Sequence, residues 1–165
     1  MIVLRRLTPG DLPRLRQFWR DHWAGEEMIV HGDIYRPEQM DGFVNEDWTG
    51  LVTYTVGSDG CEIISLDVLK ENLGIGSALL EAVEQEAGRR GCPRVFLATT
   101  NDNLRALGFY QRRGFELVGI RRHAIDETRK RKKAIPLIGD NDIPLRDEIE
   151  LEKYLPVQHS PGRQP

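Results

Sequence analysis

The stretch VLKENLGIGSALL, residues 68–80, joins the end of an apolar, strand-like run to the start of an amphipathic helix. Apolar residues recur at helical spacing across residues 74–90 and predict a helix there, which Gly91 ends. RVFLAT, residues 94–99, is a strand-length apolar run of the kind found in buried parallel strands. The order strand, helix, strand therefore predicts a βαβ unit in the middle of the chain.

Weaker patterns place further strands and helices around this unit. LVTYTV, residues 51–56, is followed by Ser-Asp-Gly and a second strand pattern, so we expect a hairpin. The other expected strands are at 2–7, 43–47, 115–120 and 145–154. Helices are expected from Thr8 to about Gly25 and from Asn101 or Asn103 to Arg113, and a loop, with a short helix as the alternative, is expected at 26–41.

These elements together predict a mixed α/β (α+β) fold. The sheet is expected to be mostly antiparallel, with about seven strands, flanking helices and the central βαβ unit. Residues 1–155 suit one domain with one core. Residues 156–165 lack core-forming groups and are expected to be a disordered tail.

Composition narrows the class of protein. The net charge of -3 argues against general nucleic-acid binding, which usually needs a basic domain. Cys61 and Cys92 are too few for a disulfide scaffold and lack metal-ligand spacing, so we expect reduced thiols and no metal site. Apolar runs are too short for a signal peptide or a membrane span. We therefore expect a cytoplasmic protein without a nucleic-acid or membrane partner.

The glycines at the start of the central helix raise the question of a bound anion. The first N–H groups of a helix have no partner within it, and the helix dipole is positive there. Gly74 and Gly76 carry no Cβ atoms, so the amides of residues 73–77 could approach a pyrophosphate closely. A dinucleotide fingerprint needs a third glycine where Leu79 stands, and a P-loop needs a lysine after Gly76. A phosphate cradle of another kind and a helix start without a ligand both stay open on these residues alone.

A second motif, TTNDNLRALGFYQRRGFELVGI, occupies residues 99–120. Its Asn103, Ala106 and Tyr110 fall on roughly one face of the predicted helix. Together, GIGSALL and N-x-x-A-x-x-x-Y-x-x-x-G-F at this separation resemble the GCN5-related N-acetyltransferase (GNAT) superfamily, over roughly residues 1–155. The ending IPLRDEIELE, with TTNDNLRAL and FYQRRGF, looks like a subgroup of small bacterial members, but it does not identify an acceptor.

The resemblance implies a GNAT-like sheet and acetyl-CoA as the acyl donor. In the family, the CoA pyrophosphate lies at the loop that matches residues 71–77, and pantetheine lies along the strand that matches residues 66–68. The residues thus expected to bind the cofactor are Leu66, Val68, Leu73, Gly74, Ile75, Gly76, Ser77, Asn103 and Tyr110. Glu71 and Asn72 stand where the family usually has Arg or Gln followed by Gly. If these two side chains matter, replacing them with Gln and Gly tightens acetyl-CoA binding; if the helix amides dominate, the affinity barely changes.

The resemblance also implies direct attack of an amine on the thioester. Tyr110 matches the usual general acid for the departing thiolate, and a tyrosine packed in the core is the alternative. Glu62 is the expected base, because the histone-acetylating branch has a glutamate at the matching place; an exposed strand carboxylate is the alternative, with a water chain as the base. Asp67 has the opposite parity along the strand, so we expect it on the other face from Glu62.

Several other polar and aromatic residues have structural explanations. We expect a structural role for His31 and His123, with a base or an acceptor contact as the alternative. We expect a solvated loop at residues 129–133, with a surface for an acidic acceptor or nucleic acid as the alternative. The three tryptophans are expected in the core, with the wall of an acceptor pocket as the alternative (Trp19, Trp23, Trp48). Three acidic residues are expected to be exposed strand charges, with attraction of a cationic amine as the alternative (Asp147, Glu148, Glu150).

The predicted activity is therefore acyl-CoA-dependent N-acyl transfer to a small-molecule or peptide amine. The alternative is a non-catalytic GNAT-like domain that binds acyl-CoA or a partner. The sequence leaves the oligomeric state open, with a homodimer among the candidates.

Overall fold

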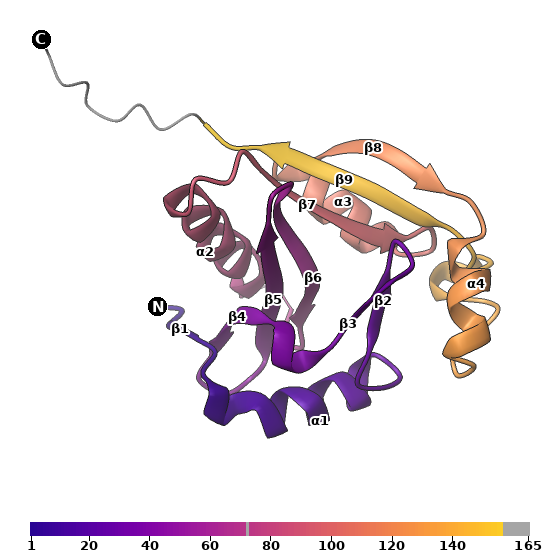
Figure 1. Cartoon of the computed structure of the whole chain (residues 1–165), viewed down its shortest axis with the longest axis horizontal. Coiled ribbons are helices and arrows are strands. Elements are labelled where there is room, and N and C mark those ends of the chain that lie inside the picture. The colour runs from indigo at the N-terminus through magenta and orange to yellow at the C-terminus, as the bar shows by residue number, and fades with distance from the viewer. Residues whose placement is uncertain (72, 157–165) are drawn as a thin grey trace, which may run out of the picture.

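The computed structural model of the chain describes residues 1–71 and 73–156. Within them, seven strands form one sheet in the order β1-β4-β5-β6-β7-β9-β8 (Figure 1). The strands are β1 (Leu4–Arg6), β4 (Asp41–Asn45), β5 (Gly50–Gly57), β6 (Gly60–Val68), β7 (Arg94–Thr100), β8 (Glu116–Arg121) and β9 (Glu148–Tyr154). Every neighbouring pair is antiparallel except β6 and β7, which are parallel. The predicted mixed, mostly antiparallel sheet is confirmed, as are the β5–β6 hairpin and the central βαβ unit.

Helices cover both faces of this sheet. They are α1 (Leu12–His22), α2 (Ile75–Arg89), α3 (Leu104–Arg112) and α4 (Ala124–Arg131), with short 3-10 turns at Pro9–Asp11, Pro37–Gln39 and Asp140–Asp142. Leu79 and Val83 of α2 pack with Val52 on one face, and burial of each such side chain contributes about 1.5–3 kcal/mol. Trp19 of α1 packs with Leu51 on the other face. The alternation of Leu51 and Val52 along β5 thus assigns α2 and α1 to opposite sides of the sheet.

The segment at residues 26–41, expected to be a loop with a short helix as the alternative, contains a β-hairpin that was not predicted. It contains β2 (Met28–Val30) and β3 (Asp33–Tyr35), followed by the 3-10 turn. His31 and Gly32 both have positive φ, 55° and 81°, as a two-residue hairpin turn requires. The hairpin lies on the α1 side, with Met28 in the same core cluster as Trp19.

The basic segment at residues 129–133 is also not a solvated loop. Its first residues belong to α4, and three of its cations are bound to the rest of the chain. Arg129 donates to the carbonyl oxygens of Ile135, Pro136 and Leu145. Lys132 Nζ donates to the carbonyl oxygens of Trp23 and Glu27, and Arg131 pairs with Glu27. Lys132 and Arg131 therefore hold the end of α4 against the loop after α1, whereas Arg129 fixes α4 to the segment that follows it.

A register shift in β6 reverses one expectation about its side chains. Tyr54 of β5 pairs with Ile63, but its neighbour Thr53 pairs with Ser65. Ile64 is therefore an extra, unpaired residue in β6. A bulge of this kind changes the parity of everything beyond it. Glu62 and Asp67 therefore share the α1 face of the sheet, and the expectation that they lie on opposite faces was wrong.

Among the described residues, no helix is long and apolar enough to cross a membrane. Cys61 and Cys92 are both buried and free. Of the predicted tail, all but the first residue lies outside the described part of the chain.

Candidate functional site

The parallel strands β6 and β7 separate part of the way along their length. Their pairing covers residues 61–63 and 95–97, whereas β6 continues to Val68 paired with β5. The last residues of β6 therefore present one backbone edge that β7 does not pair. A cleft of about 460 Å³ lies beside this edge.

The cleft brings together residues that are far apart in the sequence. Its lining comes from β6, the following loop, the start of α2 and one side of α3. All nine predicted cofactor residues line it: Leu66, Val68, Leu73, Gly74, Ile75, Gly76, Ser77, Asn103 and Tyr110. Glu62 is not part of this lining.

The start of α2 opens into the cleft. Gly74 precedes the helix with φ 73° and ψ 10°, a left-handed conformation that suits glycine. The first intrahelical bond runs from the Ala78 amide to the Gly74 carbonyl at 3.1 Å, so the preceding amides have no helical partner. A side chain at Gly76 would crowd the neighbouring helix, because its Cβ atom would lie 3.1 Å from the Phe109 ring. These residues fit an anion, because unpaired amides and the positive end of the dipole meet at one point.

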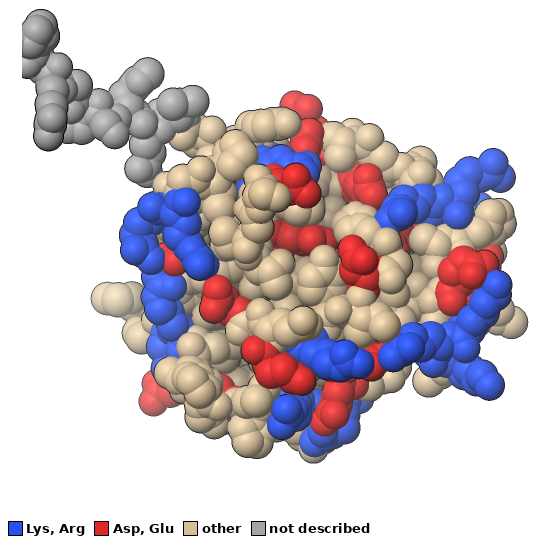
Figure 2. All heavy atoms as spheres, in the orientation of Figure 1, with Lys and Arg blue, Asp and Glu red and all other residues tan. Residues whose placement is uncertain are grey.

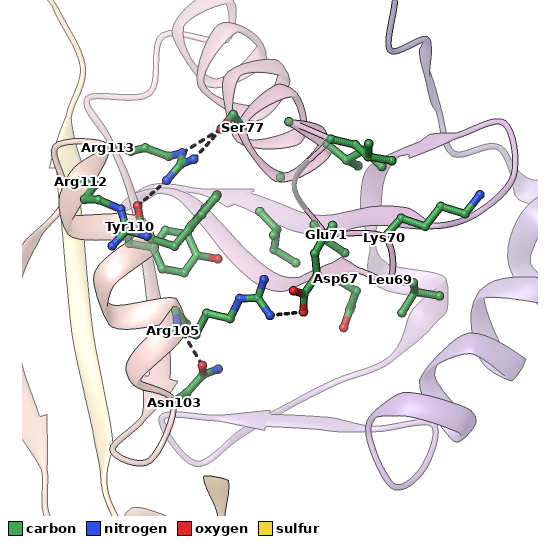
Figure 3. Close-up of a pocket in the computed structure, with 18 residues that line it drawn as sticks. Asp67, Leu69, Lys70, Glu71, Ser77, Asn103, Arg105, Tyr110, Arg112 and Arg113 are labelled. Carbon is green, nitrogen blue, oxygen red and sulfur yellow. Dashed lines mark hydrogen bonds and ion pairs between the residues drawn. The ribbon is translucent and has the colours of Figure 1, made fainter. Parts of the chain in front are cut away.

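The opposite wall of the cleft is α3. Asn103 caps this helix, and its Oδ1 accepts a bond of 3.0 Å from the Ala106 amide. Arg113 reaches across to α2, where its Nη2 and Nε lie 2.6 and 3.1 Å from Ser77 Oγ (Figure 3). Arg105 reaches the loop after β6 and is ion-paired with Glu71. This wall thus supplies several guanidinium groups next to a loop that carries an acidic side chain.

Tyr110 joins the core to the cleft. Its ring packs edge-on against Phe109 and Phe115, with centroids 5.1 and 5.4 Å away, and its hydroxyl points into the cleft (Figure 3). Burial raises the pKa of this hydroxyl, and the nearby charge of Asp67 raises it further. The phenol therefore stays protonated at neutral pH and can act as a proton donor. Tyr110 is thus packed in the core, which was the alternative expected for it, and it also lines the cleft.

Asp67 lines the same cleft from the α1 face of β6. Trp23 Nε1, just after α1, donates to both of its carboxylate oxygens at 3.1 Å. Burial raises the pKa of Asp67 to about 6, against the opposing effects of Trp23 and His22. Trp23 is thus part of the site's surroundings, whereas Trp19 and Trp48 are buried in the core, 0% and 4% exposed.

Glu62 is buried beneath the β2–β3 hairpin. Its Oε2 accepts a bond of 3.1 Å from the Tyr35 hydroxyl, and its Oε1 lies 3.2 Å from His31 Nε2. Within the described residues, no hydrogen bond of good geometry reaches Oε1. Glu62 is therefore not the exposed strand carboxylate that was the alternative expected for it, and it lies outside the lining of the cofactor cleft.

Two carboxylates of β9 complete this group around His31. The Nδ1 atom of His31 lies 3.0 Å from Glu150 and 3.9 Å from Glu148. Glu148 is only 4% exposed, so the expectation of an exposed charge was wrong for it, and burial raises its pKa. The carboxylates raise the pKa of His31, with Glu62 the main cause. Figure 2 shows acidic side chains near the middle of this view, with most lysines and arginines toward its margins.

The sequence patterns did not predict several of these contacts. Tyr35, Arg105 and Arg113 carried no expected role. The pattern Ile-Val-His-Gly-Asp-Ile-Tyr, with glycine at a two-residue turn, is the feature that could have revealed the hairpin. His123 has the local role expected of it, since its Nδ1 lies 2.8 Å from Asp126 on α4. The described residues contain no group of three or more His, Cys, Asp or Glu placed to hold a metal ion.

Comparison with known proteins places the cleft in a wider context. The model of the acetyltransferase (GNAT) family matches residues 14–115. The YxbD protein of Bacillus subtilis (strain 168) is 44% identical over 152 residues, which cover 90% of this chain and 94% of YxbD.

Two solved structures share the fold. An IAA acetyltransferase from Bacillus cereus superposes with a TM-score of 0.69 at 20% identity, covering 94% of this chain and all of its own. A GNAT family acetyltransferase from Elizabethkingia anophelis, solved with acetyl-CoA bound, gives a TM-score of 0.68 at 21% identity, covering 93% and 98%.

Proposed function

Because this chain belongs to the acetyltransferase (GNAT) family, we propose that it transfers the acetyl group of acetyl-CoA to a primary amine by direct attack. One observation carries the proposal. The open start of α2, the unpaired edge of β6 and the Tyr110 hydroxyl meet in a single cleft. Acetyl-CoA bound to the Elizabethkingia relative supports this choice of donor.

Different residues of the cleft bind different parts of the cofactor. The amides of residues 74–77 hold the pyrophosphate, because they lack helical partners and lie at the positive end of α2. The backbone of Leu66 and Val68 pairs with pantetheine along the edge of β6 that β7 leaves free. Asn103 contacts CoA from the other wall.

Tyr110 acts as the general acid. As the amine nitrogen forms its bond to the acyl carbon, the C–S bond breaks and its electron pair goes to sulfur. The Tyr110 hydroxyl supplies a proton to that sulfur. The hydroxyl carries this proton at neutral pH, because burial keeps its pKa above the ordinary value.

The acceptor approaches from the α1 side of the sheet. Glu62 and Asp67 both face that side because of the bulge at Ile64, whereas the start of α2 lies on the other side. Glu62 is the proposed base for the proton that the amine loses, and His31 and Tyr35 hold its carboxylate. The acceptor is a small-molecule or peptide amine, and the reaction takes place in the cytoplasm within one domain spanning residues 1–155.

One observation favours a second candidate function. Glu71 places an acidic side chain against Arg105 at the cleft, which suits a domain that binds acyl-CoA weakly or without catalysis. Calorimetric titration with acetyl-CoA, together with a thiol-release assay over amine, aminoglycoside, polyamine and peptide acceptors, separates the two. Binding with CoA release supports the transferase. Binding without release on any acceptor favours the second candidate, and absence of binding contradicts both.

A further inference from the structure

The cations around the cleft are not equally available to a ligand. Arg113 is engaged by Ser77, by the Phe109 carbonyl at 2.9 Å and by the Phe109 ring, with its guanidinium carbon 3.7 Å from the centroid. Lys70 is bonded to Asp47 at 2.7 Å. Arg105 is 70% exposed at its side chain, and within the described residues its one side-chain partner is Glu71. Arg105 and Lys70 thus each have a single, exposed ion-pair partner, and of these two Arg105 lies on α3, across the cleft from the start of α2.

The pair formed by Arg105 and Glu71 bridges the mouth of the cleft. Arg105 projects from α3, Glu71 follows β6, and the two side chains meet between the walls (Figure 3). A guanidinium has five N–H donors in a planar fork that matches a phosphate, and the bond to Glu71 uses one of them. Exposed ion pairs contribute little to stability, so exchange of Glu71 for a phosphate meets little resistance.

The chemistry of a phosphate makes this exchange favourable. A phosphate offers more oxygen atoms and more negative charge than one carboxylate, and Arg binds it in a bidentate manner. The start of α2 supplies amides from the other side of the same cleft. A phosphate-bearing ligand in this cleft would thus meet amides on one wall and a guanidinium on the other.

We infer that Arg105 is a phosphate ligand of CoA and that Glu71 occupies it in the free protein as an internal competitor. The inference rests on the proposed use of acetyl-CoA. It assigns the missing side-chain cation of the 71–77 loop to α3, and it gives Glu71 a defined role: it lowers the affinity for CoA by holding the guanidinium that the phosphate needs.

The test is calorimetric titration of the full chain with acetyl-CoA, CoA, 3′-dephospho-CoA and pantetheine. The variants are Glu71→Gln, Arg105→Gln and the double substitution. Glu127→Gln is the matched control, because it removes a glutamate that also forms an exposed ion pair, here with Lys130 on α4. Both of these side chains are 72% exposed, and both lie outside the cleft. Thermal unfolding of each variant checks that the fold is retained.

The expected results form a pattern. Arg105→Gln weakens acetyl-CoA binding about tenfold, the loss of one charge-assisted contact. Glu71→Gln tightens binding by about threefold in the wild type and has no effect in the Arg105→Gln background. Pantetheine, which lacks the nucleotide phosphates, binds all variants alike. If the Arg105 effect vanishes with 3′-dephospho-CoA, Arg105 contacts the 3′-phosphate; if it persists, Arg105 contacts the pyrophosphate.

Unchanged acetyl-CoA affinity in Arg105→Gln would overturn the inference. A Glu71→Gln effect that is the same with and without Arg105 would also overturn it, because the carboxylate would then act on the ligand directly. Failure of the wild type to bind acetyl-CoA is a different result, since it contradicts the proposed function. Wild-type binding with no response to Arg105 contradicts this inference alone.

Discussion

Trp23 and Asp67 are joined by one indole N–H that both carboxylate oxygens share, at 3.1 Å each. The bond connects the residue that follows α1 to the end of β6, on the acceptor side of the proposed site. It depends on the bulge at Ile64, because without the extra residue Asp67 would point to the α2 face. The carboxylate sits beside the cleft with a hydrogen-bond donor but, among the described residues, no ion-pair partner.

Asp67→Asn is expected to stabilise the protein at neutral pH. Burial raises the pKa of Asp67 to about 6, against the effects of Trp23 and His22, and Tyr110 faces it across the cleft. A folded-state pKa above the unfolded value favours folding below about pH 4, and this contribution is lost as the pH rises through 6. The variant should gain on the order of 1 kcal/mol over the wild type at pH 7, with little difference at pH 4. Urea unfolding across this range measures it, and parallel pH profiles would contradict it.

His31→Gln is expected to remove a second pH dependence. The carboxylates of Glu62, Glu148 and Glu150 raise the pKa of His31. A raised histidine pKa contributes stability that is complete below the unfolded value of about 6.5 and is lost as the pH rises through the folded value. The raised pKa of Glu148 acts in the same direction at lower pH. The wild type should therefore exceed His31→Gln in melting temperature by more at pH 6 than at pH 9, and a constant difference would count against this account.

Gly74→Ala is expected to destabilise the start of α2. A φ of 73° costs an ordinary residue about 1–2 kcal/mol, although an added Cβ would meet nothing closer than 3.8 Å. Gly57→Ala is the matched control, because that glycine has open space around it and no positive φ. Chemical denaturation of the two variants gives the comparison. Equal stabilities would show that the left-handed conformation at Gly74 is not required.

Glu62→Gln is expected to lower turnover without weakening acetyl-CoA binding. A general base contributes about 10²–10⁴-fold to rate, and the amide keeps the shape that Tyr35 and His31 hold. Initial rates against pH, on an acceptor that releases CoA, measure the loss. An unchanged pH–rate profile would assign the proton to another route, such as a chain of water molecules.

The sequence predicted the frame of the site because its features are local. Glycines and apolar periodicity define the start of α2 and its burial on β5, and Asn103 caps α3 through its own neighbour Ala106. Each of these features is set within a few residues. The nine cofactor residues themselves were implied by the family resemblance, and all of them line one cleft.

The acceptor side of the site was not predicted from the sequence, because it is built by contacts between distant segments. The strands of the β2–β3 hairpin have three residues each, too few for a periodic pattern, and His31 meets carboxylates from β6 and β9. The bulge at Ile64 is visible only in the pairing with β5. The run at residues 129–133 looked solvated in the sequence because Arg129 and Lys132 donate to backbone carbonyls of distant residues, which no side-chain pattern reveals.

The most direct test of the central claim is the comparison of Tyr110→Phe with the wild type in acetyl-CoA binding and CoA release. The substitution removes one hydroxyl and leaves the ring packed between Phe109 and Phe115. If Tyr110 is the general acid, turnover falls at least about tenfold while the dissociation constant for acetyl-CoA stays the same. Unchanged turnover with intact binding would contradict the proposed mechanism.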